Sequence, residues 1–238
     1  MSVDTTTHRS SFDRRFATGV AVTAALIVFV GFARTYYLMD VFGTPALSSG
    51  LVHLHGIVMT LWFALFVVQV RLIAAHRTDL HRRVGVVGAL LAALVLVVGV
   101  TTAIVAAKRG FTPGPPPLVF LSIPLGDMLV FAVLVSLGLL FRRRSDIHRR
   151  LMLLASVGIL GAAISRIPIG FIETGGPLTF FGLTDLCVLA CVVFDTVKNR
   201  RLHPAFGWGI LFIVASQPLR LMLTDTAVWM QFATWLTA

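Results

Sequence analysis

The fold is decided by long apolar stretches, of which VGVVGALLAALVLVVGVTTAIVAA, from Val84 to Ala107, is the clearest because it contains no charged residue. A bilayer has a hydrocarbon core about 30 Å thick, and roughly 20 apolar residues of helix are needed to cross it. Runs of this kind occur at residues 16–36, 51–75, 84–107, 118–141, 151–172, 178–197 and 205–224. Continuous apolar runs favour helices over a transmembrane β-barrel, whose strands alternate apolar and polar residues. We therefore predict an all-α integral membrane protein with seven transmembrane helices.

The composition supports this class of protein. Of the 238 residues, 57% are hydrophobic and 13% are charged, whereas a soluble domain has about 25% charged residues. The formal net charge of +10 would suggest a nucleic-acid partner in a soluble protein. Here the basic residues lie in short clusters between the apolar runs, so we expect the lipid bilayer, and no nucleic acid, as the partner.

The basic clusters also predict the topology. They occupy alternate connections, at Arg9, Arg14, Arg15, Arg77, Arg82, Arg83, Arg142, Arg143, Arg144, Arg149, Arg150, Lys198, Arg200 and Arg201. The positive-inside rule then places the N-terminus in the cytoplasm and the C-terminus in the periplasm of a multi-pass protein of the cytoplasmic (inner) membrane. Anionic lipid headgroups are the expected partners of the basic loops.

The chain divides into three parts on this topology. Residues 1–15 are predicted to form a cytoplasmic tail, residues 16–224 the seven-helix bundle, and residues 225–238 a tail along the periplasmic surface. Leu125–Phe131 (LGDMLVF) resembles Leu183–Leu189 (LTDLCVL), and each segment leads through a basic turn into a further apolar span. We therefore expect one leading helix followed by three loosely repeated helical hairpins.

A polar layer is predicted in the outer third of the membrane. Its members are Arg34, His53, His55, Asp127, Arg166, Asp185 and Arg220. The depths follow from a rise of 1.5 Å per helical residue. Ionisable residues inside a membrane are costly and are functional candidates by default.

Opposite charges at one depth are expected to form ion pairs, because an isolated ion is costly in a low dielectric. The repeat favours the pairs Asp127 with Arg166 and Asp185 with Arg220. Arg34 then gives the layer a net positive charge, which suits a carboxylate, a haem propionate or a lipid phosphate. The structural alternative is that the pairs only fix helix packing while Arg34 reaches the headgroups.

The HLHG segment, His53 to Gly56, is a candidate ligand site within this layer. Residues i and i+2 of a helix point about 200° apart, so we expect one of the rings of His53 and His55 to face the bundle. Neutral imidazole is a common ligand of transition metals and of haem iron. A hydrogen bond to a neighbouring helix and a proton relay are the alternatives.

A second set of histidines, His81, His148 and His203, lies near the cytoplasmic start of three helices. Together they would form a three-histidine metal site if those helices adjoin. The alternative is that they sit in a polar interface whose arginines contact anionic lipid headgroups.

Four motifs carry a resemblance to known sequences. They are GFARTYYL (Gly31–Leu38), LVHLHG (Leu51–Gly56), LHRRVG (Leu80–Gly85) and HRRLMLLA (His148–Ala155). This set resembles a group of uncharacterised bacterial polytopic membrane proteins over most of the chain. The resemblance implies a multi-pass fold and no particular activity.

The helical histidines are also vaguely similar to those of di-haem cytochrome b membrane proteins. In those proteins two histidines at one depth on facing helices hold each haem, whereas the outer layer offers only His53 and His55 on one helix. A haem there would need a second ligand such as Met39 or Met59, or an open position.

Three functional hypotheses follow. The first is a haem- or metal-binding protein of electron transfer or respiratory-complex assembly, with Arg34, Arg166 or Arg220 holding propionates. The second is a proton-coupled small-molecule or anion transporter or channel, in which Asp127 and Asp185 exchange protons. The third is a non-catalytic accessory protein that packs against other membrane subunits. No retinal lysine lies inside a span, and no P-loop, HExxH, GxSxG or CxxC motif indicates an enzyme.

Overall fold

The computed structural model describes residues 5–45, 47, 49–112 and 115–238, with the backbone alone for residues 5–13. The described chain is helical and contains no strand. Its helices are α1 (Thr5–Phe32), the π-helical turn η1 (Ala33–Tyr37), α2 (Met39–Phe42), α3 (Gly50–Ala74), α4 (Thr78–Lys108), α5 (Pro117–Phe120), α6 (Ser122–Leu140), α7 (Ser145–Gly158), α8 (Gly161–Ile164), α9 (Gly170–Thr174), α10 (Gly176–Asn199), α11 (Pro204–Thr224) and α12 (Ala227–Thr237).

Seven segments of the described chain are long and apolar enough to cross a membrane. Five of them contain the long helices α1, α3, α4, α10 and α11. The fourth segment combines α5 with α6, and the fifth combines α7 with α8. The prediction of an all-helical chain with seven such segments is therefore confirmed.

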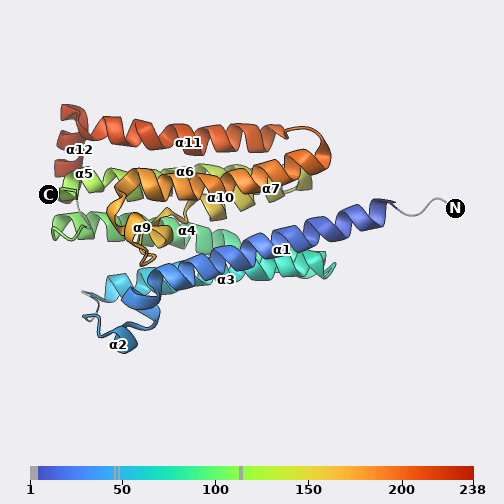
Figure 1. Ribbon diagram of the computed structural model, residues 1–238, viewed down its shortest axis with the longest axis horizontal. Coiled ribbons are helices and arrows are strands. Elements are labelled where there is room, and N and C mark those ends of the chain that lie inside the picture. The colour runs from blue at the N-terminus through green and yellow to red at the C-terminus, as the bar shows by residue number, and fades with distance from the viewer. Residues whose placement is uncertain (1–4, 46, 48, 113–114) are drawn as a thin grey trace.

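The long helices lie side by side along one axis (Figure 1). Consecutive helices pack as hairpins, α3 with α4, α6 with α7 and α10 with α11, while α1 packs on α3 and α8. The three hairpin turns, at residues 75–77, 141–144 and 200–203, lie at one end of the bundle, which we call the basic end (Figure 1). Helix α12 lies across the opposite end, which we call the far end (Figure 1).

Burial separates an interior from an apolar outer surface. Phe131 of α6 and Leu154 of α7 are fully buried. On α4, by contrast, Val86, Leu90 and Val97 are each more than 60% exposed. An apolar surface of this extent suits contact with lipid rather than with water.

The fifth segment ends earlier than the sequence predicts, before Pro168. We predicted a span over residues 151–172, but α7 begins at Ser145 and α8 ends at Ile164. Proline disfavours a helical residue before it and has no N–H to donate, so Pro168 lies in the irregular segment after α8 instead of inside a helix. Pro218, by contrast, lies inside α11.

The ends of the chain also form helices. Helix α1 begins at Thr5, so the described part of the predicted N-terminal tail continues the first span, and residues 1–4 lie outside the described residues. The C-terminal tail, residues 225–238, forms α12. Its Trp229 is buried, and the indole N–H donates to the carbonyl oxygen of Leu118 at 2.8 Å. The tail is therefore docked on the bundle through α5.

Candidate functional site

Two charged residues of the polar layer, Asp127 of α6 and Arg220 of α11, meet near the far end. Arg220 is 9% exposed, and its Nη1 donates to Oδ1 of Asp127 at 2.5 Å. The same guanidinium donates to the carbonyl oxygen of Ile123 at 3.2 Å and to Oγ of Ser216 at 2.8 Å. The predicted ion pair of Asp127 with Arg166 is therefore wrong. Helix α11 packs directly on α6 and brings Arg220, rather than Arg166, to Asp127.

A glycine makes this approach possible. A Cβ at Gly126 would overlap the side chain of Arg220. Gly126 precedes Asp127, so the lack of a side chain lets the guanidinium lie against α6 beside its carboxylate partner. This glycine is needed for close approach rather than for its backbone conformation.

Asp185 has a different partner from the one predicted. Its Oδ1 accepts a hydrogen bond from Nε2 of Gln217 at 2.7 Å. The predicted ion pair of Asp185 with Arg220 is wrong, because Arg220 pairs with Asp127 of α6 while Gln217 binds Asp185 of α10. In the described part of the chain, Asp185 forms no ion pair.

Arg166 lies in the irregular segment after α8. Its Nη1 donates to the carbonyl oxygen of Ala162 at 2.7 Å, and its guanidinium lies 5.0 Å from the centroid of the Phe32 ring. Within the described residues it forms no ion pair. Because α8 ends before Arg166, the side chain turns toward α1 and interacts electrostatically with His55.

The HLHG histidines of α3 have unequal environments. His53 is exposed, and its backbone carbonyl accepts a hydrogen bond from the hydroxyl of Tyr36 at 3.3 Å. His55 is half-buried, and its Nδ1 is buried without a hydrogen-bond partner among the described atoms. Arg34 is exposed, with its guanidinium 5.7 Å from the centroid of the Phe42 ring. Arg34 and His53 therefore stay outside the cluster formed by Asp127 and Arg220.

At the basic end, two of the three predicted histidines come together. The ring centroids of His81 and His148 are 6.2 Å apart, with an angle of 77° between the rings. Nδ1 of His148 lies 2.8 Å from the carbonyl oxygen of Gly138. Gln69 of α3 contacts the ring of His81. With the amide nitrogen of Gln69 turned toward this ring, that nitrogen donates a hydrogen bond to Nδ1 of His81 at 2.6 Å.

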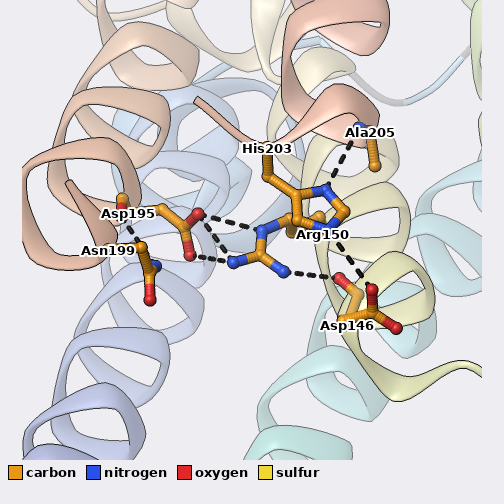
Figure 2. A network of polar contacts seen from close by, with 6 residues as sticks. All are labelled: Asp146, Arg150, Asp195, Asn199, His203 and Ala205. Atoms are coloured by element: carbon orange, nitrogen blue, oxygen red, sulfur yellow. Dashed lines mark hydrogen bonds and ion pairs between the residues drawn. The ribbon is translucent and has the colours of Figure 1, made fainter. Parts of the chain in front are cut away.

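The third histidine belongs to a separate network. Nε2 of His203 lies 3.3 Å from Oδ2 of Asp146, and Nδ1 accepts from the N–H of Ala205 at the start of α11 (Figure 2). Residues 146 and 148 point to different faces of α7, so Asp146 meets α11 while His148 meets the partner ring of His81. The predicted three-histidine metal site is therefore wrong. Among the described residues, no group of three or more His, Cys, Asp or Glu side chains could hold a metal ion.

Sequence reasoning missed the buried ion pair of this network. Arg150 is 4% exposed, and its guanidinium binds both carboxylate oxygens of Asp195 at 2.7 Å (Figure 2). We had assigned Arg150 only to a basic loop that contacts lipid. One feature of the sequence could have indicated this pair. Asp195 lies near the end of the apolar run 178–197, and Arg150 immediately precedes the apolar run 151–172, so the two residues are expected at similar depth.

The chain matches no protein-family model, and neither a curated protein nor a solved structure is significantly similar to it.

Proposed function

We propose that this chain is a multi-pass protein of the cytoplasmic membrane that binds a haem through His81 and His148 and serves electron transfer. The observation that carries the proposal is the placement of these two rings, 6.2 Å apart at the basic end of the bundle. Metal–nitrogen bonds of imidazole are about 2.0–2.1 Å long, so two rings on opposite sides of one ion have centroids roughly 6 Å apart. At this spacing His81 and His148 would be able to hold the iron of one haem, which would supply one-electron chemistry.

The number of ligands favours haem over a bare ion. A structural metal ion such as zinc needs about four protein ligands, and the described residues offer no group of three. Haem supplies the equatorial nitrogens itself, so that two histidines complete the coordination. We therefore place the proposed haem site at the basic end rather than at His53 and His55 in the outer layer.

The hydrogen bond of the His148 ring suits this role. A carbonyl oxygen only accepts, so Nδ1 of His148 carries the proton and Nε2 presents a lone pair. Metal-ligating histidines almost always donate their other N–H in this way. The Gln69 amide donates to Nδ1 of His81, so in the neutral ring Nε2 carries the proton, and a change of tautomer would be needed before Nε2 could bind a metal. Arg82 and Arg83, next to His81, are exposed and supply positive charge for propionates.

The orientation of the chain is part of the same proposal. The arginine-rich turns gather at the basic end (Figure 1), and the positive-inside rule places such an end in the cytoplasm. The far end, with α12, then lies at the periplasmic surface. A haem near the cytoplasmic surface could exchange electrons with a soluble or membrane-bound donor on that side.

The test is an absorption spectrum of the protein, purified in mild detergent after expression with added haem precursor, before and after reduction with dithionite. We expect a Soret band that His81→Ala and His148→Ala each abolish. His76→Ala removes an exposed histidine at the same end and should leave the band unchanged. A wild-type protein without the band would contradict the proposal, as would a band that disappears with His55→Ala and persists with His81→Ala.

A second candidate function rests on Asp185. This carboxylate lies within a membrane-spanning segment, and its described hydrogen-bond partner is the neutral amide of Gln217 rather than a cation. Such a group can exchange protons, as a proton-coupled transporter requires. Proton uptake into liposomes containing the protein would be lost in Asp185→Asn. Equal uptake in wild type, Asp185→Asn and empty liposomes would exclude this function.

A further inference from the structure

A small cavity opens at the basic end beside the buried Arg150–Asp195 pair. Its volume is about 170 Å³, and the residues that line it are Asp146, Arg149, Arg150, Asn199, Arg201 and His203. We call this cavity the basic pocket. It lies where α7 begins, α10 ends and α11 begins, and its walls come from the ends of α7 and α10 and from the turn between α10 and α11.

The inner wall of the basic pocket is held rigidly. Nε of Arg150 donates to Oδ2 of Asp195 at 2.9 Å, Nη2 donates to both carboxylate oxygens, and Nη1 donates to the carbonyl oxygen of Asp146 at 2.7 Å (Figure 2). The guanidinium also lies 5.6 Å from the centroid of the Phe206 ring. A planar guanidinium bound at this many points has little freedom left, so the wall is preorganised.

The rim of the pocket carries the excess charge. Arg149 and Arg201 are both exposed and form no ion pair within the described chain. The charge of Arg150 is balanced by Asp195, and Asp146 opposes one of the rim arginines. Leaving His203 out of the count, one positive charge therefore remains in excess. The amino-terminal ends of α7 and α11 add partial positive charge at the same place.

We propose that the basic pocket binds the phosphate group of an anionic ligand, with the guanidinium groups of Arg149 and Arg201 as its donors. The volume is smaller than the roughly 300–1,000 Å³ of pockets for drug-sized molecules, which fits a single phosphate group. Guanidinium matches phosphate because its N–H donors form a planar fork. The carboxylate of Asp146 is the unfavourable neighbour of such an anion.

Two sources of phosphate share this chemistry. The pocket lies at the boundary of the apolar segments, where phospholipid headgroups lie, and the exposed Leu202 and Trp208 beside it suit contact with lipid. A soluble phosphate could reach the same place from the aqueous side. The inference goes beyond the proposed haem site, because it uses the face of α7 turned toward α10 and α11 and not the ring of His148.

The test measures lipid binding by native mass spectrometry of the full chain in mild detergent, with phosphatidylglycerol as the probe. Arg149→Gln/Arg201→Gln should weaken binding at least about tenfold, since hydrogen bonds to charged groups are worth that factor or more. The matched control Arg142→Gln/Arg143→Gln removes the same charge from an exposed turn at the same end and should change binding by about twofold or less. Asp146→Asn should strengthen binding.

Inorganic phosphate at millimolar concentration, added as a competitor, separates the two sources. Displacement of phosphatidylglycerol by phosphate identifies a site for soluble phosphate, and persistence of the lipid identifies a headgroup site; both results support a phosphate pocket. Equal weakening by the two double variants would overturn the proposal, because it would mean that only the general charge of this end attracts the lipid. Unchanged binding in Arg149→Gln/Arg201→Gln would overturn it as well.

Discussion

Replacement of Arg220 by leucine is expected to lower the free energy of unfolding by about 3–5 kcal/mol, the usual cost of removing one partner of a buried ion pair. The variant loses the hydrogen bonds to Asp127 at 2.5 Å, to the carbonyl oxygen of Ile123 at 3.2 Å and to Ser216 at 2.8 Å. The larger part of the cost comes from Asp127, whose side chain is 17% exposed and would be left without its cationic partner. Leucine retains the apolar bulk, so the change isolates the polar contacts.

A double-mutant cycle measures the pair itself. Arg220→Leu and Asp127→Leu should each be strongly destabilising, while the double variant should be less destabilising than the sum by about 1–3 kcal/mol, because neither charge is then left alone. The free energies are obtained from unfolding by sodium dodecyl sulfate in mixed micelles, followed by circular dichroism. Additive single effects would show that the two side chains do not interact.

The matched control is Arg166→Leu. Arg166 is exposed, donates to one carbonyl oxygen and lies over the ring of Phe32. These contacts are worth about 1 kcal/mol or less at an exposed site. Equal destabilisation by Arg166→Leu and Arg220→Leu would contradict this prediction, because the ion pair of Arg220 with Asp127 would then contribute no more to stability than the contacts of an exposed arginine.

Two further substitutions test close packing. Gly126→Ala should destabilise the protein by about 1–3 kcal/mol, because its Cβ would overlap Arg220, whereas Gly182→Ala meets open space and should have little effect in the same unfolding measurement. Trp229→Phe should cost about 1 kcal/mol, because it removes the indole hydrogen bond to α5. Trp208→Phe is the control, since Trp208 is 73% exposed, and an equal loss in both variants would contradict the docked position of α12.

The polar layer shows where sequence reasoning stopped. Asp127, Asp185, Arg166 and Arg220 could be placed at similar depth from the sequence, because depth follows from the helical rise and the span boundaries. Their partners could not, because partners depend on which helices adjoin and how each is rotated about its axis. The predicted pairs followed the repeat in sequence, whereas the contact of α11 with α6 decided that Arg220 meets Asp127.

The histidines at the basic end also show that the direction of each side chain around its helix decides which residues meet. His81, His148 and His203 share a similar sequence setting, and the sequence grouped them as one site. A difference of two residues between Asp146 and His148 on α7 turns their side chains to different helices. The structure consequently joins His148 to His81 and leaves His203 with Asp146.

From the amino-acid pattern alone we could derive the class of the protein, the seven apolar segments and the clustering of arginine in alternate turns. We could do so because a helix in lipid must satisfy its own backbone hydrogen bonds and cover its length with apolar side chains, and both requirements are local. Three features could be seen only in the folded chain: the end of the fifth segment before Pro168, the approach of Arg220 over Gly126, and the meeting of Gln69, His81 and His148. These features depend on contacts between residues far apart in the chain, whose geometry no local pattern contains.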